Sequence, residues 1–172
     1  EKTSEYLEKA ANHARGDFQN EQALELYNRL IPRLTDQDHC ANILLQKAKV
    51  LQLTGRWDQC ELELNRALEI ANEASHQLLV GKVNNRIGRI SMLRGNYELA
   101  LKHYEVARRI FDSIQDKIGI AKVNGNLGNL YFRQGNYNKA NDFFYKSLEY
   151  SRSANIHIAR ANIVSHLGLA YM

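Results

Sequence analysis

Apolar residues recur every three or four positions through most of the chain, most clearly between residues 117 and 144. In the first half of that stretch they stand at Ile120, Val123, Leu127, Leu130 and Tyr131. This spacing places one apolar stripe along an α-helix. A glycine and an asparagine at 135 and 136 then favour a turn, and a second stripe follows from residue 138. The stretch predicts two antiparallel helices that need neighbours to bury their remaining faces.

The same pattern returns every forty residues. Glycine stands at 55, 95 and 135, and a small residue lies five positions after each. An aromatic residue, expected in the core, lies two positions after each, as Trp57, Tyr97 and Tyr137. First helices are predicted at 39–54, 77–94, 117–134 and 157–172, and second helices at 58–74, 98–113 and 138–153. Inside the first helices the same step places Ala48, Gly88, Gly128 and Gly168. A close contact with a neighbouring helix is expected to exclude larger side chains at these positions. Gly119, in contrast, is expected to be exposed.

Several segments depart from the pattern. Residues 3–36 form the least regular hairpin, in which the turn at 14–22 is expected to be about two residues longer than its counterparts and Pro32 is expected to bend or end the helix. Lys47 stands where later repeats have Ile87 and Leu127. Either its stem extends out of the core or this helix is rotated. Side-chain caps are expected at Asp116 and Asn155.

These repeats resemble the tetratricopeptide repeat, whose consensus places a small residue, glycine, an aromatic, an alanine and a second aromatic in this order along a helical hairpin. The resemblance covers nearly the whole chain. It implies an all-α, right-handed superhelical solenoid of antiparallel helix hairpins, with first helices lining the concave surface. The forty-residue period is similar to that of repeats in cell-polarity adaptors, in bacterial peptide receptors and beside the ATPases of bacterial signalling proteins.

As a domain, the chain is expected to form one solenoid fragment. Its parts are an irregular hairpin at 3–36, repeats at 38–75, 77–115 and 117–154, and the first helix of a truncated repeat at 156–172. The chain opens at Glu1 and ends at Met172 inside that helix, which indicates a fragment. Its last apolar side chains, Ile163, Leu167, Ala170 and Tyr171, are expected to pack on the preceding hairpin. The opposite side of this helix either caps the fragment imperfectly or associates with another copy.

Composition is compatible with a folded intracellular protein. Hydrophobic residues make up 44% of the chain and charged residues 24%, and no apolar run approaches the ~20 residues that a membrane-spanning helix needs. No signal peptide is visible. Cys40 and Cys60 do not share a metal-ligand spacing, so both are interpreted as reduced structural thiols of a cytoplasmic protein.

Charge is distributed unevenly between the predicted helices. The four regular first helices, at the limits given above, contain no Asp or Glu but carry Lys or Arg at ten positions. The net charge of +4 is therefore interpreted as a basic inner face partly balanced by an acidic outer one, and the groove is expected to attract anions.

The forty-residue step selects the positions that point into the groove in the family. They are Gln46, Lys49, Lys82, Asn85, Arg86, Arg89, Lys122, Asn126, Asn129 and Arg133; His166 is their counterpart in the last helix. An asparagine amide can donate and accept hydrogen bonds with a peptide backbone, and arginine pairs bidentately with carboxylate or phosphate. Carboxylate clamps of the family use Lys and Asn at such positions, but the match here is partial and their chaperone ligands are not implied. The competing interpretation is that these side chains simply solvate a concave wall.

Catalytic motifs are missing from the sequence. The six histidines form no helical metal pair, the Gly128 region lies inside a helix and lacks the features of a phosphate loop, and no nucleophile elbow is present. No enzyme activity, cofactor or metal is therefore expected.

Two classes of function remain. The first is a protein-interaction module, part of a larger signalling protein, that binds an extended or helical acidic peptide or another domain of its parent. The second is nucleic-acid binding, which is less favoured because Phe132 is the single plausible stacking residue in the groove and the net charge is modest.

Overall fold

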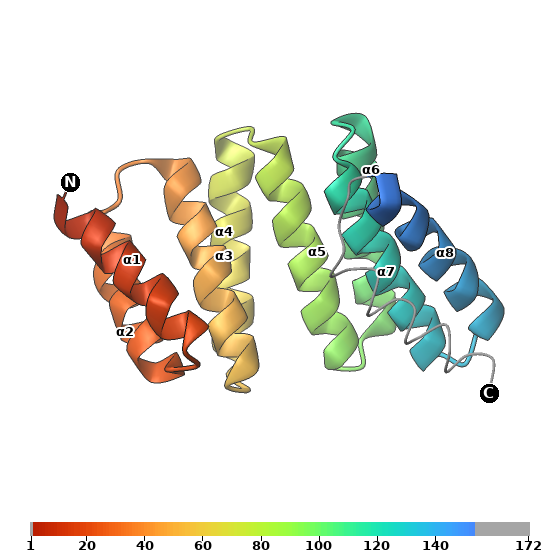
Figure 1. Cartoon of the computed structure of the whole chain (residues 1–172), viewed down its shortest axis with the longest axis horizontal. Coiled ribbons are helices and arrows are strands. Elements are labelled where there is room, and N and C mark those ends of the chain that lie inside the picture. Colours follow the sequence, from red (N-terminus) through yellow and green to blue (C-terminus); the bar gives the residue numbers. More distant parts are fainter. Residues whose placement is uncertain (1, 154–172) are drawn as a thin grey trace. The chain divides into compact units, whose positions relative to one another are not determined.

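The computed structural model describes residues 2–153, which are helical throughout apart from short connectors (Figure 1). The helices are α1 (Lys2–Gly16), α2 (Asn20–Leu30), η1 (Ile31–Arg33, a 3-10 helix), α3 (Gln37–Leu53), α4 (Trp57–Glu73), α5 (Gln77–Leu93), α6 (Tyr97–Ser113), α7 (Lys117–Arg133) and α8 (Tyr137–Ser153). No strand occurs in this range. The expected all-helical hairpin fold is confirmed, with helix limits within two residues of those predicted.

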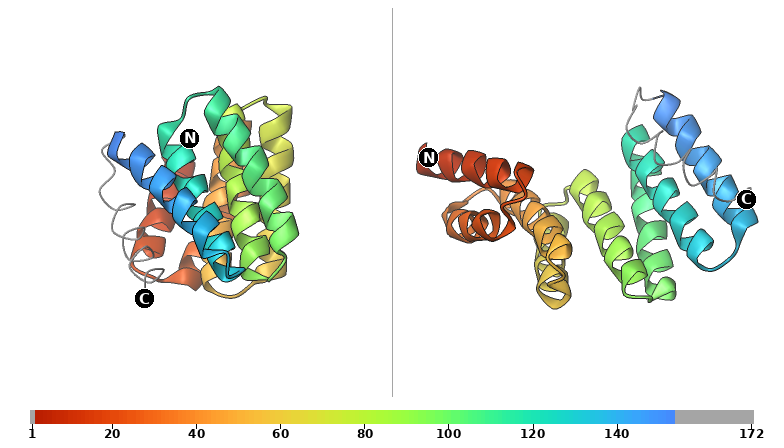
Figure 2. Two further views of the ribbon diagram at one scale, coloured as in Figure 1. Left: turned by 90° about the vertical axis from the view of Figure 1, so that its right-hand side faces the viewer. Right: turned by 60° about the horizontal axis from the view of Figure 1, so that its bottom comes forward.

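The chain divides into two compact units, residues 1–79 (unit 1) and 80–172 (unit 2). In unit 1, α1 packs on α2, α2 on α3, and α3 on α4. In unit 2, α6 packs on α7, and α7 on α8. Figures 1 and 2 show the α1–α2 hairpin in red and the α7–α8 hairpin in teal and blue.

Each regular hairpin turns through a glycine in the left-handed conformation. The φ angles of Gly55, Gly95 and Gly135 are 71°, 82° and 75°, a region that residues with a Cβ enter at a cost. In the first hairpin Phe18 takes this place with a φ of 59°. The expectation of a longer turn there is wrong, because residues 17–19 connect α1 to α2 just as residues 54–56 connect α3 to α4.

Two mid-helix glycines lie where an aromatic ring crosses the helix. A Cβ on Gly88 would approach the Tyr104 ring to 2.7 Å, and one on Gly128 would approach the Phe144 ring to 2.5 Å. Both distances are shorter than any normal contact, so the expected close packing at these positions is confirmed. The expectation for Gly119 is wrong. It is buried, and a Cβ there would lie 2.4 Å from the Phe111 ring, because the first turn of α7 rests directly on α6.

The aromatic residue that begins each second helix is less buried than expected. Trp57 and Tyr97 are partly buried, and Tyr137 is 52% exposed. Each stands at the first position of its helix, at the edge of the hairpin. The Tyr137 ring packs edge-on against Phe132, with ring centroids 5.4 Å apart. A core position is therefore the wrong assignment for Tyr137.

Smaller expectations have mixed outcomes. The helix containing Pro32 does end: α2 stops at Leu30 and a 3-10 turn follows. Asp116 caps α7, since its carboxylate accepts a hydrogen bond from the backbone N–H of Ile118 at 3.1 Å. The stem of Lys47 does not extend out of the core, because its side chain is 13% exposed and its ammonium group donates to the Glu63 carboxylate on α4. A rotation of this helix stays a prediction. The expected cap at Asn155, the helix at 156–172 and its four packing residues lie outside the described residues.

Candidate functional site

The polar face shared by α5 and α7 is the strongest candidate site in unit 2. Within their observed limits neither helix contains Asp or Glu. On α5 the polar side chains lie three or four positions apart and therefore on one side of the helix, as they do on α7. This α5–α7 polar face consists of Lys82, Asn85, Arg86 and Arg89 together with Lys122, Asn126, Asn129 and Arg133.

An asparagine pair joins the two helices across this face. The side-chain N–H of Asn126 donates to the side-chain oxygen of Asn85 at 2.9 Å, and both residues are partly buried. The bond uses one donor of Asn126 and the oxygen of Asn85, which leaves the Asn85 amide nitrogen as a donor and the Asn126 oxygen as an acceptor. A peptide group has one carbonyl acceptor and one N–H donor. The Asn85 nitrogen can donate to the first, and the Asn126 oxygen can accept from the second.

Three guanidinium groups of this face act on the pKa of a single buried hydroxyl. Tyr104 of α6 is fully buried, and burial raises the pKa of its phenol well above the ordinary value. The positive charges of Arg89, Arg86 and Arg133 act in the opposite direction on that pKa. Arginines from both α5 and α7 thus act on the same phenol, so the field of their positive charges extends over this part of unit 2.

In unit 1 the predicted groove residues lie on α3 and one of them is hydrogen-bonded to α1. The forty-residue repeat does not predict this contact between α1 and α3. Gln46 on α3 accepts hydrogen bonds through one side-chain oxygen from Arg15 of α1 and from Lys49, each at 2.8 Å. At the other end of these helices His39 of α3 lies 2.9 Å from the Glu8 carboxylate of α1. Both contacts between the helices span 31 residues. A search for this second spacing would have found Arg15, which the sequence analysis missed.

None of the ten predicted groove residues is buried. Lys82, Arg89, Lys122 and Arg133 are exposed, and the other six are partly buried. The structure brings Asn85 and Asn126 together, and Gln46 with Lys49. These last two belong to unit 1 and the other eight to unit 2.

The charge pattern of the predicted helices needs two corrections. First, α3 begins at Gln37 and therefore includes Asp38, which lies 2.9 Å from the imidazole of His76. Second, among the second helices of the three regular hairpins an acidic surplus is found in unit 1 alone. There α4 has five acidic residues against one arginine, whereas in unit 2 α6 has three of each sign and α8 has two acidic against three basic residues.

The balance of charged residues changes sign at the boundary between unit 1 and unit 2. Residues 1–79 contain 9 Lys and Arg against 13 Asp and Glu, and residues 80–172 contain 14 against 6. The surplus of positive charge therefore belongs to unit 2.

A second amide in unit 2 lies deeper. The nitrogen of the buried Asn84 side chain donates to the Val80 carbonyl, so its oxygen faces His103 Nδ1 at 2.9 Å. Because that oxygen can only accept, Nδ1 of His103 carries the proton. Burial lowers the pKa of His103 below its ordinary value of 6.5. This pair supports the α5–α6 hairpin behind the polar face.

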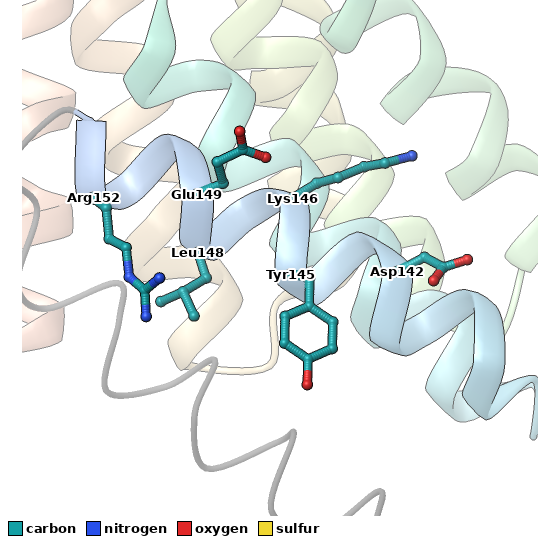
Figure 3. A pocket seen from close by; sticks show the side chains of 6 residues that line it. All are labelled: Asp142, Tyr145, Lys146, Leu148, Glu149 and Arg152. Atoms are coloured by element: carbon teal, nitrogen blue, oxygen red, sulfur yellow. The ribbon is translucent and has the colours of Figure 1, made fainter.

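Another concave surface lies along α8 and has a different character. A hollow of about 570 Å³ is lined by Asp142, Tyr145, Lys146, Leu148, Glu149 and Arg152. In Figure 3 all six side chains extend from the single helix α8. Two acidic and two basic groups balance there, so the hollow does not select an anion.

Groups that could hold a metal ion are not assembled in the part of the chain that the structure describes. No three His, Cys, Asp or Glu side chains cluster there as metal ligands. Cys40 and Cys60 are not in a disulfide, and burial raises the pKa of Cys40, which disfavours its thiolate. Among residues 2–153, no helix is long and apolar enough to cross a membrane.

Known structures share this fold. RapI in its apo form is 18% identical with a TM-score of 0.87, over 99% of this chain and 64% of RapI. Aspartyl phosphate phosphatase F from Bacillus subtilis is 14% identical with a TM-score of 0.85, over 94% of this chain and 43% of the phosphatase. BtubC (BKLC) from P. vanneervenii is 18% identical with a TM-score of 0.73, over 97% of this chain and 79% of BtubC. These likenesses concern the fold.

No curated protein matches the chain. The tetratricopeptide repeat, in contrast, matches two overlapping segments, residues 39–113 and 79–153. Together the segments cover more than half of the sequence and include every helix from α4 to α8 completely. The period, the glycine turns and the helix hairpins agree with this match, and the chain belongs to the tetratricopeptide repeat family.

Proposed function

We propose that this chain is a protein-interaction module whose α5–α7 polar face binds an extended or helical acidic peptide segment. The observation that carries the proposal is that α5 and α7 together contain six Lys and Arg residues but no Asp or Glu. A face with one sign of charge attracts the opposite sign and disfavours like-charged partners. Tetratricopeptide repeats serve as interaction scaffolds, which supports a protein ligand over a small molecule.

The asparagine pair supports a peptide ligand in particular. After the bond between Asn126 and Asn85 is made, the pair still offers a donor and an acceptor on the basic surface. A chain with regularly spaced amide groups can use both, while its acidic side chains contact Arg86 and Arg89. Binding is thus expected to combine backbone hydrogen bonds with charge pairing.

Nucleic acid is the less favoured ligand. Phe132 was the candidate for base stacking, but its ring packs against Tyr137 and the cluster of Ala140, Phe144 and Leu148. A ring held in such contacts offers less surface to a base.

The wider context is also part of the proposal. The chain spans 64% of RapI and 43% of phosphatase F, and we infer that it is a non-catalytic regulatory or sensor part of a larger cytoplasmic signalling protein. The acidic segment then comes from a partner protein or from another domain of the same parent. A reducing compartment agrees with two cysteines that are not in a disulfide.

Binding of a fluorescein-labelled peptide of alternating Glu and Ala, followed by anisotropy, tests the proposal. Changing both Arg86 and Arg89 to Glu is expected to weaken binding by about tenfold or more, with the loss shrinking as salt rises. Asn126→Ala is expected to cost about 1–3 kcal/mol of binding free energy with little dependence on salt. Changing Lys102 and Arg109 of α6 to Glu is the matched control, since it alters the charge of unit 2 equally outside the polar face.

Three outcomes would oppose the proposal. Equal losses in the Arg86/Arg89 and Lys102/Arg109 variants would indicate attraction to net charge alone. Equal binding of a peptide with Gln in place of Glu would remove the acidic requirement. Tighter binding of a polyuridine RNA, with a steep salt dependence and no response to Asn126→Ala, would favour the nucleic-acid alternative.

A further inference from the structure

We propose that two copies of this chain associate through one face of α8, packed antiparallel about a twofold axis that passes close to residue 147. This α8 face consists of the residues that line the hollow of about 570 Å³ along the helix, which are Asp142, Tyr145, Lys146, Leu148, Glu149 and Arg152 (Figure 3). The α8 face shares no residue with the α5–α7 polar face, so the proposal does not depend on a peptide ligand.

The α8 face is open to solvent at repeat positions that a following helix does not cover. Five of its six residues are exposed, and Leu148 is buried. On α6, the positions forty residues before 142, 145, 149 and 152 are occupied by Lys102, Glu105, Arg109 and Asp112. All four are exposed although α7 packs on α6. A second copy can therefore reach these positions without displacing the neighbouring hairpin.

The order of side chains along the α8 face is complementary to itself. Asp142 and Arg152 stand five positions before and after residue 147, and Tyr145 and Glu149 stand two positions before and after it. These four residues share one side of the helix, because successive members are three or four positions apart. Antiparallel packing thus brings Asp142 of each copy towards Arg152 of the other, and Tyr145 towards Glu149. Parallel packing would place like charges together, so charge selects the antiparallel orientation.

Apolar surface lies near the centre of this arrangement. The Tyr145 side chain is 51% exposed, and Leu148 borders the same hollow. An aromatic side chain near the centre with charged groups around it is typical of protein interfaces. The ammonium group of Lys146 lies 5.3 Å from the centroid of the Phe143 ring, and in Figure 3 this side chain extends in a different direction from Tyr145 and Leu148. Its charge is therefore directed to the border of the face.

The corresponding surface of α6 has opposite charges but no aromatic centre. Lys102 and Asp112 stand where α8 has Asp142 and Arg152, and they too are opposite in sign. Glu105, however, replaces Tyr145, and Lys102 already lies 3.3 Å from the carboxylate of Glu98 on its own helix. The contact is therefore assigned to α8, and α6 offers a matched control.

Sedimentation velocity of the full 172-residue chain tests the proposal. One helix face from each copy makes a small interface, so the series should extend from about 10 μM to 1 mM. The native chain should change from monomer to dimer within this range. Asp142→Arg and Arg152→Asp each place like charges opposite one another and should each raise the dissociation constant about tenfold or more. The two changes combined reverse both charges, so the double variant should dimerise as the native chain does.

Lys102→Asp is the matched control, because it changes the net charge as Arg152→Asp does but on α6. It should leave the dissociation constant unchanged. A native chain that stays monomeric throughout the series would overturn the proposal without any variant. A double variant that associates no better than the single ones would overturn it, because self-complementary charge predicts recovery. A loss of association in Lys102→Asp equal to that in Arg152→Asp would assign the contact to net charge or to α6 instead.

Discussion

The ammonium group of Lys47 on α3 donates a hydrogen bond to the carboxylate of Glu63 on α4, and each side chain is 13% exposed. An ion pair thus lies between the two helices of this hairpin, in surroundings that keep most water away. The corresponding pairs one and two repeats later are Ile87 with His103 and Leu127 with Phe143. The first regular repeat therefore uses opposite charges where the third uses two apolar side chains.

Replacing one member of this pair should cost far more than replacing both. Lys47→Leu leaves the Glu63 carboxylate largely buried without its partner, and we expect a loss of about 3–5 kcal/mol in the free energy of unfolding. Lys47→Leu combined with Glu63→Phe copies the pair of the third repeat and should be neutral or stabilising by about 1–4 kcal/mol. Urea unfolding measures both. A double variant as unstable as Lys47→Leu would show that the pair is not interchangeable with the apolar one.

Asn124 should be a weak point of α7. Its side chain is 3% exposed, and its oxygen has no hydrogen-bond partner among the described residues. Its counterpart on α3 is the buried Leu44, which shows that the fold accepts an apolar side chain at this position. Asn124→Leu is therefore expected to raise the free energy of unfolding by about 1–3 kcal/mol, because the unpaired polar group is removed.

The matched change at Asn84, one repeat earlier, should act in the opposite direction. Asn84 accepts a hydrogen bond from His103, so Asn84→Leu leaves the imidazole N–H without its acceptor. Chemical denaturation compares the two variants directly. Stabilisation by both would contradict the importance assigned to the hydrogen bond of Asn84.

Phe18 should be replaceable by glycine with a gain in stability. It holds a φ of 59° and is 80% exposed, so the substitution removes backbone strain without losing much buried area. The expected gain is about 1 kcal/mol. Gly95→Phe is the reverse change at a regular turn, where a Cβ would meet no neighbour within 4 Å, and it should destabilise. Thermal unfolding that shows Phe18→Gly to be destabilising would contradict the equivalence of the two turns.

His103 should make stability depend on pH. Burial lowers the pKa of His103 in the folded chain below its ordinary value of 6.5, so the unfolded chain binds a proton more readily. Stability from this residue is present above pH 6.5 and falls as pH drops from there to the folded pKa, below which it is constant. We expect the difference in unfolding free energy between native protein and His103→Phe to shrink on acidification through this range. A difference that stays constant between pH 7.5 and 5 would contradict this expectation.

The helices were predictable because the forty-residue period is imposed by the turns. Gly55, Gly95 and Gly135 each supply the left-handed residue that ends one helix and allows the next to pack back on it. A periodic apolar stripe on either side of such a turn leaves few other arrangements. The first hairpin was harder to predict because Phe18, which is not a glycine, takes the left-handed conformation at its turn.

Side-chain partners were less predictable than helices. The forty-residue step compares equivalent positions of different repeats. The burial of Lys47 is explained by its hydrogen bond to Glu63, which stands at a different position of the repeat. In later repeats the residues at both positions differ from this pair. Arg15 was missed because α1 and α3 are in contact at a 31-residue spacing. The pattern selects ten residues whose place in a groove stays a prediction. It does not indicate the hydrogen bond between Asn126 and Asn85, because that bond depends on how close α5 and α7 lie.

The opposite charge balances of the two units have a kinetic consequence. Residues 80–172 carry a surplus of basic groups and residues 1–79 a surplus of acidic ones. An acidic segment diffusing toward the chain is drawn to unit 2 and repelled by unit 1 before any hydrogen bond forms. If the ligand is acidic, as proposed, salt should slow the association rate much more than it alters the dissociation rate, and the speed of the first encounter would then contribute to the choice of partner.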